Sequence, residues 1–309
     1  MTIDLTANAD GNFGSAGRYL YRLVNASHEH GIAVVVDAVY AHAHPEFPYN
    51  LVYETSGEPN PMMGQFAEEF FSRAGVDFSK EYSRDFFFAV NQYWLKQFHV
   101  DGFRYDYVPG MFDGPTGQGY ANLVFRTYEH SQQFASFPRF QGPSGRSLII
   151  QCAEHLPDAR GILRTTYSNT CWQNGLLDES AAQAKQPVRD SFARQLDPEL
   201  IGYPKEYRNP VTGDALPVAP FQYFESHDHS RFINRFGEEQ LRDLLGQPYG
   251  NRDRFYKTQP YVIALYTCKG IPMLWHGQKQ SWHRDFAGRH LLYASVGESV
   301  NGAFMVESP

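Results

Sequence analysis

The sequence predicts an α/β fold in which helices alternate with the strands of a parallel sheet. Three patterns predict it: short runs of almost continuously apolar residues, intervening segments with apolar residues at helical spacing, and polar side chains where the apolar runs end. The chain has 309 residues, of which 42% are hydrophobic and 20% are charged. This composition excludes a disordered protein and provides for a sizeable core, as one large domain or two small ones.

The first helix and the first strand are expected near the N-terminus. Residues 17–30 carry apolar side chains at helical spacing, and Gly31 suits the left-handed backbone that ends a helix. The run Ile32–Tyr40 is rich in β-branched residues and almost continuously apolar, which predicts a strand covered on both faces. Residues 41–82 are rich in Pro, Gly, Glu and Phe without a sustained period, so we expect a short excursion there.

The alternation continues along the chain. Ser83 suits the start of a helix that extends to about Phe98, and further helices are expected at about residues 119–135, up to about 196, and at 252–267. Six strands are expected, at Ile32–Tyr40, Val100–Asp106, Ser147–Glu154, Gly175–Ser180, Phe221–Asp228 and Ile271–Gly277. Such alternation is typical of an open doubly wound sheet or of a (β/α)8 barrel of the TIM type.

The ends of the predicted strands favour the barrel. Polar side chains lie at or just past the C-terminal ends of different strands, namely Asp37, His42, Asp106, Glu154, His227 and Asp228. Barrel enzymes assemble their active sites at this end of the strands. An open sheet has its site at one switch point, and no glycine-rich phosphate loop follows any predicted strand.

Charge and cysteine content exclude several classes of protein. Lys and Arg number 27 against 34 Asp and Glu, a net charge of −7 without any basic block, so no nucleic-acid partner is expected. No apolar run approaches the roughly 20 residues of a membrane span, and no secretory signal is visible. Cys152, Cys171 and Cys268 are widely spaced without a CxxC pair, which predicts reduced thiols in a cytoplasmic protein.

Arg104 and Asp106 stand two residues apart on a predicted strand, so their side chains leave the same face. A carboxylate next to a permanent cation stays ionised, which suits a nucleophile or an electrostatic stabiliser. The alternative is a structural salt bridge. Glu154 ends an apolar strand, where partial desolvation favours the protonated carboxyl of a general acid, although a hydrogen-bonded carboxylate at a strand end is an equal alternative.

Asp228, next to His227, adds a third carboxylate at another strand end. Two carboxylates in opposite protonation states, with a third that stabilises positive charge, are the minimal set for glycoside hydrolysis through an oxocarbenium-like transition state. An isolated His-Asp pair is otherwise typical of a local hydrogen bond.

Five segments resemble a known family. VVVDAVYAH, DGFRYD, IIQCAEH and FESHD, in this order, resemble the four conserved motifs of the α-amylase family, glycoside hydrolase family 13. The later IPMLWHGQ is similar to that family's last-strand segment, so the resemblance extends from about Gly31 to Gln278. The short excursion and YWLKQFHVDGFRYD look most like glycogen branching enzymes and maltooligosyltrehalose trehalohydrolases.

The resemblance implies a retaining hydrolase or transglycosidase that acts on α-1,4-linked glucans or maltooligosaccharides without a cofactor. It implies that Asp106 is the nucleophile, Glu154 the acid/base and Asp228 the stabiliser of the transition state. The residues implied to orient these groups or to bind the sugar are Asp37, His42, Arg104 and His227. The choice between hydrolysis and transfer depends on the loops around the acceptor, which the sequence does not define.

The chain also departs from the family pattern. Ala41 replaces the Asn of the first motif that helps to hold calcium, so no metal is expected. YVPG follows DGFRYD where typical α-amylases have a Lys-His pair, which speaks against an ordinary endo-acting α-amylase. Lys279 replaces a Glu that usually follows the Gly-Gln pair of the last segment.

The architecture departs as well. In the family the first motif lies on the third barrel strand, yet only about thirty residues precede it here, so strands one and two and the C-terminal β-domain are expected to be missing. We therefore expect a single partial barrel domain over residues 1–309, truncated at both ends. Its open sheet edges would favour self-association.

Two alternatives from other classes stay open. A metal-dependent barrel hydrolase would draw its ligands from His42, His44, His155, His227 and His229. That alternative leaves the arginine-aspartate pair without a role. A non-catalytic glucan-binding remnant of an enzyme would use aromatic residues as sugar-stacking platforms, although aromatic residues are more typical of core packing.

Overall fold

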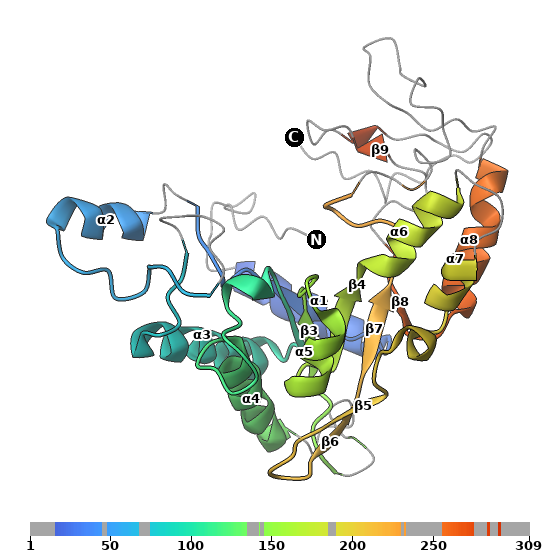
Figure 1. The fold of residues 1–309 in the computed structure, drawn as a ribbon. Coiled ribbons are helices and arrows are strands. Elements are labelled where there is room, and N and C mark those ends of the chain that lie inside the picture. The colour runs from blue at the N-terminus through green and yellow to red at the C-terminus, as the bar shows by residue number, and fades with distance from the viewer. Residues whose placement is uncertain are drawn as a thin grey trace. The chain divides into compact units, whose positions relative to one another are not determined.

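The computed structural model describes residues 16–44, 48–67, 75–134, 142, 145–184, 190–229, 232, 255–274, 283–284 and 290–291. The chain divides into two compact units, whose helices and strands are labelled in Figure 1. The first unit comprises Met1–Trp172 and Pro204–Ala219, and the second comprises Gln173–Tyr203 and Pro220–Pro309. The single partial barrel domain over the whole chain stays a prediction.

The first unit is built on parallel strands in the order β1, β2, β3 and β4. Their bounds are Val35–Ala38, Gly102–Tyr105, Ile150–Ala153 and Thr170–Gln173. Every residue of β2 and β4 is buried, as expected of parallel strands that are covered on both faces. The register places Asp37 beside Arg104 and Arg104 beside Cys152, so polar residues of neighbouring strands lie at one level.

The prediction that the first strand is covered on both faces is wrong. Within the described ranges β1 has β2 as its only strand neighbour, so it forms an edge of the sheet. Val35 and the flanking Ile32 and Val39 are 38%, 59% and 50% exposed. An apolar run predicts the strand but does not show whether helices or loops cover each of its two faces.

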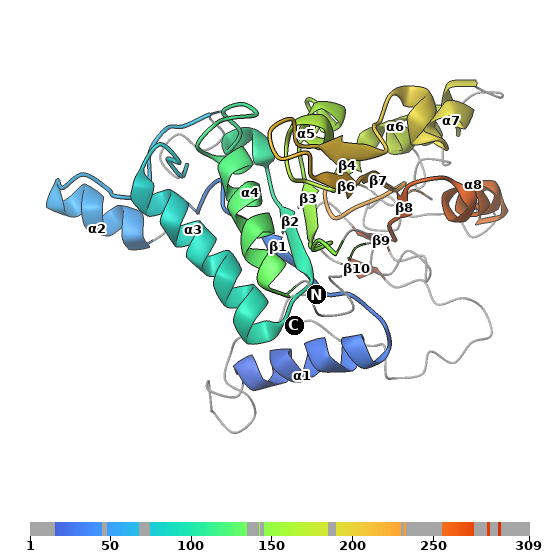
Figure 2. The ribbon, with the colours of Figure 1, turned by 90° about the horizontal axis from the view of Figure 1, so that it is seen from below.

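Helices alternate with these strands along the chain, at α1 (Ala16–Glu29), α2 (Pro48–Ser56), α3 (Glu81–Tyr93), α4 (Tyr120–Ser131) and α5 (Ala159–Thr165). α3 continues as a π-helical turn over Trp94–Phe98, and short 3-10 turns follow β2 and α4, over Val108–Gly110 and Gln132–Phe134. α3 and α4 lie side by side (Figure 2). None of the helices in the described part is both long and apolar enough to span a membrane.

The predicted helix cap at Ser83 is wrong. The N-cap of α3 is Lys80, and the helix begins two residues before Ser83. The Ser83 side chain is instead fully buried, and its hydroxyl donates a hydrogen bond to the backbone oxygen of Met62 at 3.1 Å. A serine near a helix start suits the cap by residue type, but here it joins the helix to the preceding loop.

A buried polar network ties the strands of the first unit to α3 and α4. The Asn91 amide of α3 donates to the hydroxyls of Tyr105 and Thr127, and its oxygen accepts from the hydroxyl of Tyr40, all at 2.9 Å. The Tyr105 hydroxyl in turn donates to Gln151 on β3 at 3.2 Å. Tyr105 alternates along β2 with Arg104 and Asp106, so the network holds the strand from the face opposite to those two side chains.

A β-hairpin that the sequence did not predict completes the first unit. β5 (Glu206–Arg208) pairs antiparallel with β6 (Ala215–Pro217). The Asn209 side chain accepts the backbone N–H groups of Val211 and Thr212, and Gly213 adopts a left-handed φ of 73°. This is ordinary Asn and Gly turn chemistry, and strands of three residues give too short a pattern to be found by periodicity.

The second unit contains the remaining elements. Its helices are α6 (Asn174–Gln183), α7 (Asp190–Gln195), a 3-10 turn (Pro198–Ile201) and α8 (Phe255–Thr267). Its strands are β7 (Ala219–Gln222), β8 (Ile271–Pro272), β9 (His283–Arg284) and β10 (His290–Leu291). β7 and β8 are parallel, with Phe221 beside Ile271, whereas β9 and β10 are antiparallel.

The strand predicted at Gly175–Ser180 is wrong, because these residues belong to helix α6. The strand lies just before them, as β4. The Gln173 side chain accepts the backbone N–H of Leu176 and so caps the start of the helix. A short apolar run next to a helix start does not separate strand from helix by periodicity alone.

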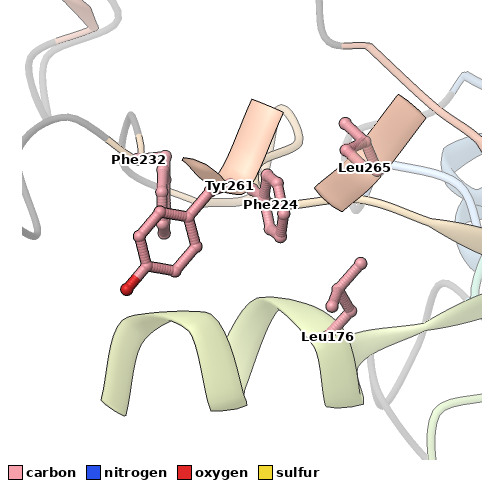
Figure 3. Packing of buried hydrophobic residues seen from close by; sticks show 5 residues of the cluster. All are labelled: Leu176, Phe224, Phe232, Tyr261 and Leu265. Carbon is pink, nitrogen blue, oxygen red and sulfur yellow. The ribbon is translucent and has the colours of Figure 1, made fainter. Parts of the chain in front are cut away.

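Aromatic residues from distant parts of the sequence form the core of the second unit (Figure 3). The cluster consists of Leu176, Phe224, Phe232, Tyr261 and Leu265. The rings of Phe224 and Phe232 stack with centroids 5.0 Å apart, and Tyr261 meets Phe232 edge-on at 5.0 Å. The cluster fixes α6 against α8 and against the segment that follows β7.

Candidate active site

Arg104 on β2 binds three carboxylates of the first unit. Its Nη1 atom donates to Asp37 Oδ1 at 2.8 Å and to Asp106 Oδ1 at 2.6 Å. Its Nη2 atom lies 2.8 Å from Glu154 Oε2. The parallel register of β1, β2 and β3 brings these groups together, because it aligns Asp37 with Arg104 and places Glu154 directly after β3. The predicted pairing of Arg104 with Asp106 is present and extends to two more carboxylates.

The guanidinium is held from one face by an aromatic ring. Its Cζ atom lies 4.4 Å from the ring centroid of Trp172 on β4, and both side chains are buried. Burial lowers the pKa of Arg104, but the charges of Glu154, Asp37 and Asp106 raise it by more, so that its pKa is above the ordinary value. Arg104 is therefore a fixed cation in a mostly buried place.

Glu154 has a perturbed acidity. Burial raises the pKa of its carboxyl from the ordinary 4.5 to about 7, and the charge of Asp106 adds to the rise. The Arg104 guanidinium and the backbone N–H of Tyr107, which donates to Oε2 at 2.9 Å, oppose the shift. Desolvation thus outweighs both favourable partners, and Glu154 exchanges its proton near neutral pH.

The backbone at Tyr107 is strained, and its N–H donates to Glu154. Tyr107 follows Asp106 directly and has a φ of 45°, in the left-handed region that non-glycine residues rarely adopt. Such a conformation costs of order 1–3 kcal/mol and persists where surrounding contacts enforce it. Two backbone hydrogen bonds do so here, from Asp106 to Ala38 at 3.1 Å and from Val108 to Glu154 at 3.0 Å.

His42 lies next to Asp106. Its Nε2 atom is 3.6 Å from Asp106 Oδ2, and the two side chains are 20% and 21% exposed. Its ring also meets the ring of Tyr107 edge-on, with centroids 6.4 Å apart. Arg104 therefore binds one carboxylate oxygen of Asp106, and His42 lies near the other oxygen. The Asp106 side chain is still 21% exposed, so a ligand can reach it.

The remaining predicted site residues lie in the second unit. His227 and Asp228 follow β7, and His227 Nε2 is 3.3 Å from Asp228 Oδ2. The backbone N–H of Asp228 donates to Ser226 Oγ, which also lies 2.7 Å from His229 Nδ1. The structure thus brings Asp37, His42, Arg104, Asp106 and Glu154 together in the first unit, and His227 and Asp228 together in the second.

The histidines offer no metal centre within the described part of the chain. Among the residues that the structure describes, no group of three or more His, Cys, Asp and Glu side chains is arranged to hold a metal ion. Ala41, at the position of the family's calcium ligand, is buried and supplies no side-chain oxygen. Lys279, Gln278 and the end of the last predicted strand at 275–277 lie outside the described residues.

The sequence did not single out Trp172 or Tyr107. The run Thr170–Gln173 has only four residues and a polar residue at each end, so its pattern does not predict a strand. It is nevertheless the strand that places the Trp172 ring next to Arg104. Tyr107 acts through its backbone N–H, which no residue type reveals. The aromatic and β-branched content of the run was the one available signal for Trp172.

Curated proteins with similar sequences are named as trehalohydrolases, branching enzymes and a pullulanase. The chain is 31% identical over 301 residues to a malto-oligosyltrehalose trehalohydrolase of Saccharolobus solfataricus, an alignment that covers 89% of this chain and 49% of that protein. It is 35% identical over 223 residues to a 1,4-alpha-glucan branching enzyme of Mycobacterium sp. (strain KMS), covering 66% of this chain and 28% of that enzyme. The chain thus spans about half or less of these relatives. No protein-family profile matches the chain.

Solved structures share the fold. A cyclomaltodextrinase superposes with a TM-score of 0.62 at 15% identity, over 93% of this chain and 45% of that one. An Anoxybacillus alpha-amylase gives a TM-score of 0.60 at 12% identity, over 85% and 52%. At this identity the likeness shows the fold, which is the incomplete (β/α)8 barrel that the sequence predicted.

Proposed function

We propose that the chain is a member of the α-amylase family and carries the catalytic centre of a retaining glycosidase or transglycosidase acting on α-1,4-linked glucans. The names of its relatives support the substrate class, since they include a 1,4-alpha-glucan branching enzyme and a malto-oligosyltrehalose trehalohydrolase. Asp106 and Glu154, which share the Arg104 guanidinium, are the observation that carries the proposal.

The two carboxyls suit different roles. Asp106 lies against Arg104 and is partly exposed, as a nucleophile requires. The pKa of Glu154 is raised to about 7, so a large fraction is protonated at neutral pH, as a general acid requires. A nucleophile beside a fixed cation and a second carboxyl that holds a proton form the arrangement of retaining glycosidases.

The reaction follows from these roles. Asp106 attacks the anomeric carbon, and the bond to the leaving sugar oxygen breaks as Glu154 gives that oxygen its proton. Glu154, now a carboxylate, takes a proton from water or from a sugar hydroxyl, whose oxygen then displaces Asp106. Asp228 is proposed to stabilise the positive charge of the transition state. The residues proposed to bind the sugar or to orient Asp106 are Asp37, His42, Arg104 and His227.

The proposal also covers location and association. We place the enzyme in the cytoplasm, in line with the free thiols of Cys152, Cys171 and Cys268. The exposed edge strand β1 is proposed to favour self-association, because Val35 and its neighbours leave apolar surface open. No nucleic acid, membrane, metal or cofactor is part of the proposal.

Incubation of the 309-residue chain with maltooligosaccharides and amylose tests the proposal. New reducing ends report hydrolysis, and new linkages with few new reducing ends report transfer. Asp106→Asn is the matched control, because it keeps the shape of the side chain and removes its charge. Turnover that is lost in the control supports the proposal. A folded chain that binds glucan without turnover would support the non-catalytic remnant instead.

A further inference from the structure

The side chain of Tyr107 departs from the alternating pattern of β2. Along an extended strand successive side chains point to opposite faces, so a continued strand would place Tyr107 on the face of the fully buried Tyr105. Tyr107 instead has a left-handed backbone, with φ 45° and ψ 55°. Its ring meets the ring of His42 edge-on, with centroids 6.4 Å apart. The strained backbone thus directs the ring toward a side chain that borders Asp106.

Tyr107 is also joined to both proposed catalytic carboxyls. It follows Asp106 along the chain, and its backbone N–H donates to Glu154 Oε2 at 2.9 Å. The neighbouring His42 places its Nε2 atom 3.6 Å from Asp106 Oδ2. A sugar bound against Asp106 therefore has the Tyr107 ring as a close neighbour.

Contacts on two sides hold the Tyr107 ring. A Cβ atom added to Gly110 would lie 3.1 Å from Cδ1 and 3.3 Å from Cε1 of the ring, so the ring packs directly on the Gly110 backbone. Gly110 belongs to the buried 3-10 turn Val108–Gly110, and the His42 ring contacts Tyr107 from another side. Tyr107 is nevertheless only half-buried. The ring is fixed before a ligand arrives, and part of the residue stays open to one.

The strain at Tyr107 is not explained by its backbone donor alone. Every residue except proline supplies an N–H, and glycine or asparagine adopts a left-handed backbone at a lower cost than tyrosine. Strained residues of this kind cluster at active sites and ligand clamps. A fixed aromatic ring next to Asp106 and Glu154 is therefore a feature that the donor to Glu154 does not require.

We propose that the Tyr107 ring is a wall of the sugar site and packs against the apolar face of the glucosyl unit that Asp106 attacks. The choice of a glucosyl unit rests on the proposed function. A pyranose ring has a face of C–H groups besides its hydroxyls, and an aromatic ring covers such a face well. The ring touches the sugar before and during the reaction, so it determines affinity for the sugar more than the rate of the chemical step.

Calorimetric titration with maltotriose tests this contact in the full chain. The parent protein carries Asp106→Asn, so that glucan is not consumed. Tyr107→Asn removes the ring, whereas asparagine tolerates the left-handed backbone and keeps the N–H. This change is expected to raise the Kd about tenfold, the size of a well-packed aromatic contact. The matched control Tyr19→Asn removes an exposed ring from α1 and is expected to keep the parent Kd.

Tyr107→Phe separates the ring from its hydroxyl. Phenylalanine retains the aromatic face, so its Kd is expected to lie closer to that of the parent than the Kd of Tyr107→Asn does. In the chain with an intact Asp106, Tyr107→Asn is expected to raise KM more than it lowers kcat, because the contact is present in the ground state and in the transition state. A lower kcat at an unchanged KM and Kd would overturn the contact.

A stability measurement separates the lost sugar contact from misfolding. Urea unfolding shows whether each variant is folded under the conditions of the titration. Tyr107→Gly repeats the ring removal with a residue that adopts the left-handed backbone freely, so the test does not depend on the asparagine variant alone. Equal Kd values for the parent and the folded ring-removal variants, or no binding of maltotriose to the folded parent, overturn the contact.

The sugar contact and the catalytic function can fail separately. If binding depends on the Tyr107 ring while the wild type turns over no glucan, the contact stands and the proposed catalytic function fails. If the wild type turns over glucan while binding does not depend on the ring, the catalytic function stands and the contact fails.

Discussion

The guanidinium of Arg104 lies over the indole of Trp172, with Cζ 4.4 Å from the ring centroid. Arg104 contacts Asp37, Asp106 and Glu154 at its nitrogen atoms. The ring therefore fixes the position of the one cation that both proposed catalytic carboxyls share. We assign Trp172 as a positioning residue, because it acts on the two carboxyls through Arg104.

Trp172→Leu tests that role. Loss of a cation–π contact in a buried place is expected to lower kcat/KM on maltooligosaccharides about tenfold. The pKa of Glu154 should also rise, because a displaced Arg104 opposes its protonation less. Trp172→Phe keeps a ring and is expected to retain most activity and the wild-type pH profile. Equal effects of the Leu and Phe variants on kcat/KM and on its pH profile would show that the contact between the Trp172 ring and Arg104 does not position the guanidinium.

The pH dependence of activity tests the assignment of Glu154. Its pKa is raised to about 7, and the acid must carry its proton when the leaving oxygen departs. We expect kcat/KM for maltooligosaccharides to fall as pH rises through about 7. The first step with α-maltosyl fluoride needs no proton, since fluoride leaves as an anion. If kcat/KM for the fluoride substrate also fell as pH rises through the same range, that result would argue against Glu154 as the acid.

The same shift links stability to pH. Between about 4.5 and 7 the folded chain holds a proton on Glu154 that the unfolded chain releases, so the contribution of this group to stability falls as pH rises through that window. Glu154→Gln does not titrate. Its unfolding midpoint, relative to the wild type, is expected to rise from pH 4.5 to 7 and then to level off. Urea unfolding at several pH values measures this difference, and a pH-independent difference would refute the linkage.

Gly102 at the start of β2 has no room for a side chain. A Cβ atom there would lie 1.9 Å from the backbone oxygen of Ile150 on the neighbouring strand. Gly102→Ala is therefore expected to destabilise the chain by several kcal/mol, since neither backbone can move without breaking the β2–β3 ladder. Gly17→Ala is the matched control, because its Cβ would only touch the Phe98 ring at 3.8 Å. Similar unfolding midpoints for the two variants would show that the sheet can shift to make room for the added methyl group.

The sequence predicted the alternation of helices and strands well, because long apolar runs and helical periods carry it. It misplaced the fourth strand, where Gly175–Ser180 is helix α6 and the strand is the four-residue run Thr170–Gln173. It also missed the hairpin at Glu206–Arg208 and Ala215–Pro217, whose strands are too short for a period to show.

For the site, the sequence located Arg104 and Asp106 by their spacing on one strand and Glu154 by its place at a strand end. It did not show that one guanidinium joins Asp37, Asp106 and Glu154, because strand register is a property of the folded sheet. The sequence could not identify the backbone N–H of Tyr107 as a donor to Glu154 either, because every residue except proline supplies such a group.

Trapping the covalent intermediate on the 309-residue chain would show whether Asp106 is the nucleophile. In Glu154→Gln, α-maltosyl fluoride can still form the glycosyl-enzyme, but the base that completes turnover is missing, so the intermediate should accumulate. Mass spectrometry of the intact chain and of its peptides is predicted to find one maltosyl group, on Asp106, and none in Glu154→Gln that also carries Asp106→Asn. A folded Glu154→Gln chain that gains no maltosyl group, or gains it on another residue, would contradict the retaining mechanism through Asp106.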